Sequence, residues 1–330
     1  MPLLGAGTLF EETLERLSRL SAPEQSWVVS ARSLGPITKR ALRAHPGVRL
    51  LLEPVARNTA AAIAWAAARI AAEAAPNDLM AIFPADHHIP APAAFERTVR
   101  GAARAAAAED CLVLIGIEPT RPDTGYGYIQ VAQPAAKEAS RPRALRVRRF
   151  LEKPSAARAR RFLRAGTYLW NAGMVVGPPR LILEELEHHS PEVWTGLGPL
   201  LTRLRAGRRV AAATLEAGYR RVRPISFDFA VLERSRKLRA VRGAFRWSDL
   251  GSWDALSEHL PERDGNRVRK GTSLRALEAS GNLVWTARKR EVALLGVSGL
   301  AVIETDSGLL VCPLDRAQEV RRLAQVRGKA

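Results

Sequence analysis

Short apolar runs alternate with helix-like segments along the first third of the chain, and this alternation constrains the fold more than any other feature. We predict strands over residues 27–29, 48–52, 79–83 and 112–117, and helices over 8–20, 37–44, 58–75 and 93–107. Repeated strand–helix–strand units build a parallel sheet covered by helices on both faces. The sequence therefore predicts an α/β fold.

The pattern becomes less regular after residue 117 and changes again after about Gly265. Predicted strands at 126–131, 146–151 and 169–176 are followed by helical cover, including a short helix over 227–234. Beyond residue 265, short strands recur between turns such as Gly281-Asn282 and Ser298-Gly299, which is typical of a β solenoid. We expect a first domain over residues 1–263 and a small β domain over 264–330, with a final helix over 316–326.

Composition narrows the class of protein. The chain has 330 residues and is 47% hydrophobic, and it contains neither a run of the roughly 18 apolar residues that a membrane span needs nor a signal peptide pattern. The two cysteines, Cys111 and Cys312, lie far apart in sequence and give no disulfide framework or zinc spacing, so we expect a reducing, cytoplasmic setting. The net charge of +18 comes with scattered arginines and no aromatic platform, so we expect neither nucleic acid nor a membrane as a partner.

Two aspartates stand where strands end. The apolar run before Pro84 delivers Asp86, at the carboxyl end of a predicted strand, where open α/β sheets bind ligands. His87 and His88 beside it suggest a metal site, and the plain alternative is an aspartate that caps the next helix. Asp249, between Trp247 and Trp253, is the second lone acid at the end of a predicted strand. Two aspartates from distant parts of the chain suit Mg²⁺, which prefers oxygen ligands, and by the same rule the histidines are not expected as ligands.

Three further clusters carry polar groups at strand ends or turns. Glu53 follows a strand, and Asn58 opens a helix; Glu53 could accept from two adjacent N–H donors such as those of guanine, or the segment could be a proline turn with Asn58 as the cap. Gly125 lies in a turn where a ligand could approach the backbone. Glu152-Lys153 offers a carboxylate for hydroxyl groups and a point charge for phosphate, or simply a surface ion pair.

Taken together, these segments resemble the mannose-1-phosphate guanylyltransferases. The matching stretches run in order along nearly the whole chain: 53–60 (EPVARNTA), 83–89 (FPADHHI), 116–129, 150–154 (FLEKP), 168–174 (YLWNAGM), 226–230 (SFDFA) and 247–253 (WSDLGSW). The stretch after residue 265 is similar to the left-handed β-helix of the single-function members. The resemblance implies a Rossmann-like nucleotide-diphospho-sugar transferase domain followed by a small left-handed β-helix.

The resemblance also implies a reaction and a set of site residues. A mannose 1-phosphate oxygen would attack the α-phosphorus of GTP, and pyrophosphate would leave. Carried over by position, the resemblance implies that Asp86 and Asp249 hold Mg²⁺ and that Lys153 binds the sugar phosphate, so that these three are the catalytic residues. The residues that face the nucleotide are Glu53, Asn58, Thr59 and Ala60. The residues that hold the mannose are Gly125, Glu152 and Asn171. Whether the protein is a homodimer stays open.

The beginning of the chain departs from the family pattern. Members open with a strand and a Gly-Gly-x-Gly-x-Arg loop for the triphosphate, whereas Met1–Phe10 matches what normally follows these elements. Loss of a central strand should expose an apolar slot and unpaired backbone groups. One hypothesis is that the natural start lies upstream of Met1; the other is a natural variant that binds sugar nucleotide or a regulatory partner without turnover.

Overall fold

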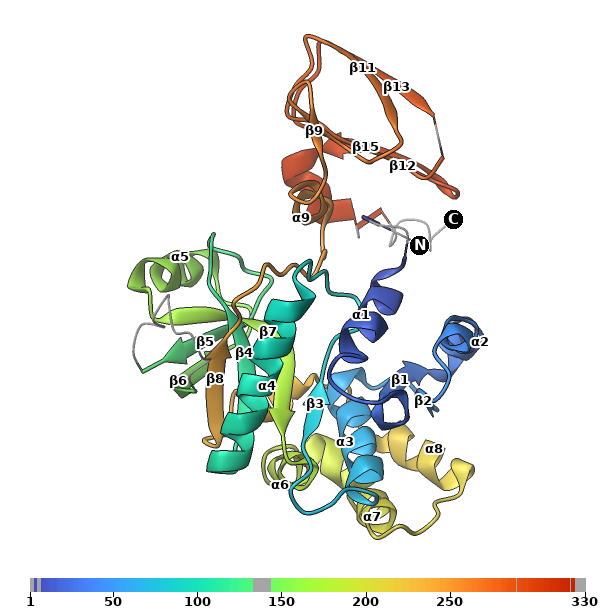
Figure 1. Ribbon diagram of the computed structural model, residues 1–330, viewed down its shortest axis with the longest axis vertical. Coiled ribbons are helices and arrows are strands. Elements are labelled where there is room, and N and C mark those ends of the chain that lie inside the picture. The colour runs from blue at the N-terminus through green and yellow to red at the C-terminus, as the bar shows by residue number, and fades with distance from the viewer. Residues whose placement is uncertain (1–2, 5–6, 133–143, 289, 321, 324–330) are drawn as a thin grey trace. The chain divides into compact units, whose positions relative to one another are not determined.

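The computed structural model describes all residues except 1–2, 5–6, 133–143, 289, 321 and 324–330 (Figure 1). Within this part of the chain, two compact units can be distinguished. The larger consists of residues 13–85 and 89–247. The smaller gathers residues 1–12, 86–88 and 248–330, so that it joins three separated segments.

The larger unit is built on a six-stranded sheet with the order β3-β7-β4-β8-β6-β5. Its strands are β3 (Met80–Ile82), β4 (Leu112–Ile117), β5 (Tyr128–Val131), β6 (Leu145–Leu151), β7 (Tyr168–Gly177) and β8 (Leu238–Arg242). Only β4 and β8 run parallel in it; the other pairs are antiparallel. The expectation of a parallel sheet was therefore wrong here. The ten-residue β7 inserts in the opposite direction between β3 and β4, a long-range pairing that the local alternation of elements does not encode.

Helices cover both faces of this sheet, as predicted. Every residue of β4 is buried, because alternate side chains enter two different cores: Leu112 and Leu114 one, Val113 and Ile115 the other. The second core includes Phe95 and Val99 of α4 (Pro92–Glu109). The first includes residues of α3 (Asn58–Ala71), α6 (Pro179–His189) and α7 (Pro191–Arg205). A strand buried on both faces reads as a continuous apolar run, which is how it was found in the sequence.

The alanine-rich helix α3 is the centre of the first core. Six of its alanines are at most 3% exposed, and the helix packs against both α6 and α7. Small side chains let helix backbones approach closely, so the alanine content has a packing role here. Trp65 fills the remaining space and meets Tyr219 of α8 (Ala212–Arg221) edge to face, with ring centroids 6.0 Å apart.

Two strands stand apart from the six-stranded sheet. β1 (Trp27–Ala31) and β2 (Arg49–Glu53) form a separate parallel pair, next to α2 (Gly35–Ala41). Among the described residues, β1 pairs with β2 alone and β3 with β7 alone, although α3 contacts both β1 and β3. Every residue of β1 is partly exposed.

The smaller unit contains a β solenoid. One sheet has the order β15-β14-β12-β10-β9, and a second pairs β11 with β13. Their bounds are β9 (Glu262–Arg263), β10 (Asn266–Val268), β11 (Ser273–Leu277), β12 (Leu283–Thr286), β13 (Glu291–Leu295), β14 (Leu300–Thr305) and β15 (Gly308–Pro313). The predicted final helix is a 3₁₀ segment, η5 (Leu314–Val320); most of the rest of 316–326 lies outside the described residues.

Side-chain amides and one tryptophan hold the solenoid together. Asn266 and Asn282 are fully buried, and the Asn282 Nδ2 donates to the Oδ1 of Asn266 at 2.8 Å. Trp285, also fully buried, packs near Trp253 of α9 (Trp253–Ser257) and donates its Nε1–H to the carbonyl of Leu3 at 3.3 Å. The segment before α1 (Leu9–Leu17) is therefore part of this unit.

Local sequence explains where α1 begins and where α5 (Ala156–Ala165) begins and ends. Thr8 and Glu11 form a capping box: the Thr8 N–H donates to Glu11 Oε2 at 2.7 Å, and the Glu11 N–H donates to Thr8 Oγ1 at 3.3 Å. α5 begins after Ser155 and ends at Gly166, whose φ of +65° suits a glycine. None of the described helices combines the length and the apolarity needed to cross a membrane.

Candidate functional site

Glu53 ends β2 in a buried environment. The residue is 8% exposed, and its Oε1 has no hydrogen-bond partner. Burial raises the pKa of Glu53 from 4.5 to about 7, and a hydrogen bond with the Tyr219 side chain partly offsets the rise. A buried carboxylate oxygen without a donor is unfavourable in the free protein, so this position suits a ligand that supplies N–H groups.

The start of α3 lies next in the chain and is strained. Asn58 has φ of +65°, and its Oδ1 accepts from the Thr59 N–H at 2.8 Å. The Thr59 Oγ1 accepts from the Phe227 N–H at 2.9 Å, and the Ala60 N–H donates to the Ile225 carbonyl at 3.2 Å. Asn58 and Thr59 are exposed, whereas Ala60 is fully buried and its N–H is already used. Of the three, Asn58 and Thr59 are the ones open to a ligand.

Glu152 and Lys153 follow directly on β6. Their side chains form an ion pair at 3.7 Å, with Glu152 11% and Lys153 62% exposed. Burial, and then the negative charge of Asp228, raise the pKa of Glu152 to about 7, while Lys153 lowers it. Lys153 has φ of +45°. Positive φ also occurs at Asn58 and at Leu250, beside Asp249. It occurs equally at three described residues outside the predicted site, so it does not by itself mark a ligand site: Asp110, Asp264 and Glu278.

Asn171, on β7, connects this pair to a further carboxylate. Its Nδ2 donates to Asp228 Oδ1 at 2.8 Å, and its Oδ1 accepts from the Gly173 N–H at 3.1 Å. The Asn171 N–H donates to the carbonyl of Gly127 at 2.8 Å. A Cβ at Gly127 would lie 2.5 Å from Glu152 Oε2 and 3.3 Å from the Asn171 Cβ. The fold thus brings Glu152 and Asn171 together, as expected for one ligand site.

Gly125 lies two residues before this close approach, in an exposed turn. Its N–H donates to Asp123 Oδ1 at 2.8 Å, within the turn itself. Tyr128 supports the same turn, because its hydroxyl donates to the Asp123 carbonyl at 2.9 Å. The predicted contact between Gly125 and a sugar therefore depends on van der Waals approach to an exposed backbone, since the N–H is already donated.

Asp86 and Asp249 both belong to the smaller unit. His88 and Ser248 form an isolated antiparallel bridge, with backbone N–H···O distances of 2.9 and 3.1 Å. The Asp86 side chain is 81% exposed, and Asp249 Oδ1 accepts from the Gly251 N–H at 3.1 Å. Asp86 and Asp249, which are 163 residues apart in sequence, thus lie on two segments that this bridge joins.

By their chemistry the two aspartates suit a hard cation, because Mg²⁺ prefers oxygen ligands. Nucleotidyl transferases generally use a divalent metal. Over the described residues, no group of three or more His, Cys, Asp or Glu side chains is arranged to hold a metal ion. Two carboxylates with substrate phosphates completing the coordination is the arrangement that Mg²⁺ commonly adopts, and the assignment of Asp86 and Asp249 to such a site stays a prediction. His87 is 3.9 Å from Asp86, and His88 lies 3.6 Å from Glu12, so both histidines face protein carboxylates.

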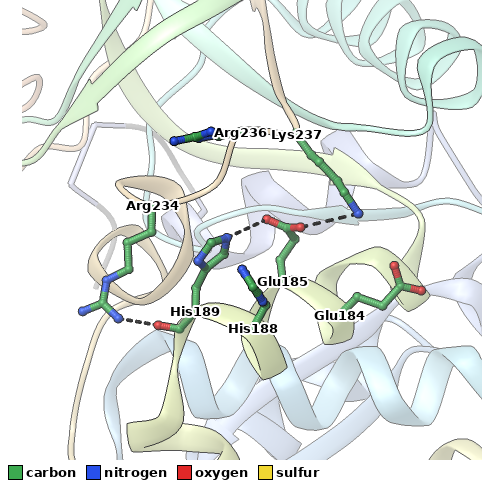
Figure 2. Close-up of a pocket in the computed structure, with 7 residues that line it drawn as sticks. All are labelled: Glu184, Glu185, His188, His189, Arg234, Arg236 and Lys237. Atoms are coloured by element: carbon green, nitrogen blue, oxygen red, sulfur yellow. Dashed lines mark hydrogen bonds and ion pairs between the residues drawn. The ribbon is translucent and has the colours of Figure 1, made fainter.

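A surface pocket elsewhere in the larger unit contains none of the predicted site residues. Figure 2 shows its lining: Glu184, Glu185, His188, His189, Arg234, Arg236 and Lys237. At its centre, the carboxylate of Glu185 lies 3.3 Å from His189 and 3.7 Å from Lys237. Burial lowers the pKa of His189, so Lys237 is the cation that balances the charge of Glu185 in this pocket.

Two polar residues of the site were missed in the sequence. Asp228 lies in the quoted segment 226–230 but was given no role there, and Tyr219 lies in α8, beyond the end of the helical cover expected from the sequence. Both act on predicted residues: Asp228 on Asn171 and Glu152, and Tyr219 on Glu53. For Asp228 the lone acid within an aromatic segment was an available signal; for Tyr219 no local signal exists.

Comparison with known proteins agrees with this geometry. The model of the nucleotidyl transferase family matches residues 1–263, and that of the MannoseP isomerase/GMP-like β-helix domain matches 276–325. A mannose-1-phosphate guanylyltransferase of Sinorhizobium fredii is 34% identical over 98% of the chain, and the alginate biosynthesis protein AlgA of Pseudomonas aeruginosa is 33% identical over 98%. The chain spans 62% and 66% of the length of these relatives.

A solved structure is similar throughout. The crystal structure of a Thermus thermophilus protein described as a mannose-1-phosphate geranyltransferase matches with a TM-score of 0.84 and 34% identity, covering 98% of this chain and 90% of that one. It supports a nucleotidyltransferase domain followed by a β-helix. The domain boundary at residue 263 stays a prediction, because the last segment of the smaller compact unit already begins at Ser248. The fold, the order of the motifs and the matched family model agree: this chain belongs to the nucleotidyl transferase family.

Proposed function

We propose that this protein transfers GMP from GTP to mannose 1-phosphate and releases pyrophosphate. The observation that carries the proposal is the cluster of Glu152, Asn171 and Lys153: a carboxylate and an amide for sugar hydroxyls beside an exposed ammonium group for the sugar phosphate. The names of the relatives, guanylyltransferase and alginate biosynthesis protein, favour mannose 1-phosphate as the acceptor.

The guanine specificity is assigned to Glu53. Its unpartnered Oε1 is an acceptor that needs a donor, and guanine presents two adjacent N–H donors. Asn58 and Thr59, exposed at the start of α3, are assigned to the same nucleotide, with Ala60 providing the buried base of the turn. Adenine presents an acceptor at N1 and no N–H at position 2, so Glu53 would discriminate against it.

The chemical step needs positioning and neutralisation of charge more than covalent help from the protein. An oxygen of the mannose 1-phosphate attacks the α-phosphorus of GTP, the bond between that phosphorus and the β-bridging oxygen breaks, and pyrophosphate carries away the electron pair. Lys153 holds the attacking phosphate, and Glu152, Asn171 and Gly125 orient the sugar. Asp86 and Asp249 would hold Mg²⁺, which when bound neutralises the charge on the phosphates.

The test is pyrophosphate release from GTP and mannose 1-phosphate with Mg²⁺, using this chain and a version extended upstream of Met1 by a Gly-rich loop. In whichever form turns over, Asp249→Asn should lower kcat/KM about 100-fold or more with unchanged circular dichroism, because it removes one negative ligand. Asp110→Asn is the matched control, since Asp110 pairs with Arg180 and belongs to none of the site motifs.

The outcomes separate the two candidate functions. Turnover that requires both substrates supports the proposal. Saturable binding of GDP-mannose by both forms, without pyrophosphate release from either, would establish the alternative of a non-catalytic sugar-nucleotide-binding protein. Absence of both binding and turnover in the two forms would overturn the assignment.

A further inference from the structure

Asp228 is a carboxylate to which neither the sequence motifs nor the proposed reaction gives a role. It is the first residue of a single π-helical turn, η4 (Asp228–Leu232). Such turns are rare and occur frequently at functional sites. Burial raises the pKa of Asp228, and the hydrogen bond from Asn171 lowers it. A partly buried acid at a π turn, bonded to a predicted sugar ligand, is a candidate for a specific task.

The bonds of Asn171 define the first part of that task. An amide side chain can be turned by 180° with little change in shape, so its donor and acceptor are fixed only by their partners. Here the Nδ2 donates to Asp228 at 2.8 Å, and the Oδ1 accepts from the Gly173 N–H at 3.1 Å. A carboxylate accepts and never donates when ionised, so Asp228 permits one orientation only. One N–H of Asn171 then remains for a ligand oxygen.

The charges around Glu152 define the second part. Asp228 and Glu233 add negative charge near Glu152, and Lys153 adds positive charge at 3.7 Å. Glu233 Oε1 also accepts from the backbone N–H of Glu152 at 2.9 Å. Among these carboxylates Asp228 has the largest influence on Glu152. A like charge disfavours ionisation, so Asp228 keeps Glu152 protonated to higher pH than burial alone.

We propose that Asp228 is a positioning residue for the sugar subsite, which locks the Asn171 amide in one orientation and places a second negative charge beside Glu152. The inference rests on the proposed assignment of Glu152 and Asn171 to the sugar. Its consequence is that sugar binding depends on pH near neutrality, because ionised Glu152 accepts from hydroxyl groups more strongly than the neutral acid.

GDP-mannose is the appropriate probe, because its diphosphate is esterified at both ends and carries no group that titrates near neutral pH. Its affinity is measured by calorimetry between pH 5.5 and 8.5, and GDP at pH 8.5 gives the part of the affinity that does not come from the sugar. Glu53 also has a pKa near 7. Glu152→Gln therefore serves to identify which part of the pH dependence belongs to Glu152.

For the wild type, we expect the affinity for GDP-mannose to rise with pH through about 7. Asp228→Asn should move the Glu152-dependent midpoint down by about one pH unit, the size expected for one nearby like charge. It should also weaken GDP-mannose binding about fivefold at pH 8.5, because the amide that replaces the carboxylate can present either a donor or an acceptor to Asn171. Asp228→Asn should leave the affinity for GDP unchanged. The control Asp110→Asn should change neither the midpoint nor the affinity for either ligand.

The results are decisive in each case. A variant that merely lost structure would weaken both ligands without moving the midpoint, and that outcome would overturn the inference. An unmoved midpoint with unchanged affinity would do the same. If the wild type binds GDP-mannose no more tightly than GDP, the proposed sugar site itself fails. In the Glu152→Gln background, Asp228→Asn should produce no pH shift, and a persisting shift would contradict the argument.

Discussion

Replacing Glu53 by glutamine should stabilise the folded protein at alkaline pH and weaken its binding of guanine nucleotides. Glutamine has nearly the shape of a protonated glutamate but cannot ionise. The pKa of Glu53 is raised from 4.5 to about 7 because the carboxyl is buried. The folded state therefore binds more protons than the unfolded state between these pH values. The stabilisation associated with the protonated form is complete below pH 4.5 and is lost as the pH rises through about 7.

The expected magnitude follows from the size of the shift. A rise of roughly 2.5 pKa units corresponds to about 3 kcal/mol between the protonated and ionised forms, and partial screening by solvent lowers the usable part to about 2 kcal/mol. Glu53→Gln should thus resemble the wild type near pH 5 and exceed its free energy of unfolding by about 2 kcal/mol at pH 8. Guanine would lose a charge-assisted pair of hydrogen bonds, so the affinity for GDP at pH 8 should fall about 10- to 100-fold.

The assay is urea unfolding at pH 5, 6, 7 and 8, comparing the two proteins at each pH so that all other titrating groups cancel. Binding of GDP and ADP is measured at pH 8, because loss of the Glu53 acceptor should reduce the preference for GDP. Glu73→Gln is the control, since Glu73 is an exposed partner of Arg49. Equal stability increments at pH 5 and pH 8 would refute the burial argument. An unchanged preference for GDP over ADP would refute the assignment of Glu53 to guanine.

Two further predictions concern packing. Gly127→Ala should destabilise the larger unit by about 1–3 kcal/mol in urea unfolding, because the new methyl group would lie 2.5 Å from Glu152 Oε2 and 3.0 Å from the Phe150 ring. It should also weaken GDP-mannose binding with little change for GDP. Gly7→Ala is the control, because the atom nearest to its new methyl group is 3.4 Å away. Asn282→Ala should cost the smaller unit about 3 kcal/mol or more, monitored by tryptophan fluorescence, because its side chain donates to Asn266 and Val297 and accepts from the Leu300 N–H. A loss below about 1 kcal/mol would show that water replaces these bonds.

The sequence predicted best those features that depend on local pattern. The run Leu112–Ile117 was predicted with its observed bounds, because a strand buried on both faces is apolar throughout. The pairing of strands was predicted less well. The direction of β7 and the separation of β1 and β2 from the larger sheet depend on contacts between distant segments, which the periodicity of one segment does not contain.

The same division holds for the candidate site. Glu152 and Asn171 were expected to share one ligand, and the structure brings them together through Gly127. The groups that set their chemistry were not found: Asp228 is 57 residues from Asn171, and it acts through one side-chain hydrogen bond. The lone acid in the aromatic segment 226–230 was a local signal for Asp228, but its partner could be identified only from the tertiary structure.

The bond between Trp285 and Leu3 has a consequence for the order of assembly during synthesis. The two residues are 282 positions apart, so the segment around Leu3 leaves the ribosome long before its partner is made. Until then Leu3 and Leu4, which pack on the core of the smaller unit, have no apolar partner there. Contacts of such long sequence separation form late and slowly. The nascent chain therefore carries an uncovered apolar segment while the residues between the two are translated, and this segment is a natural contact for a chaperone.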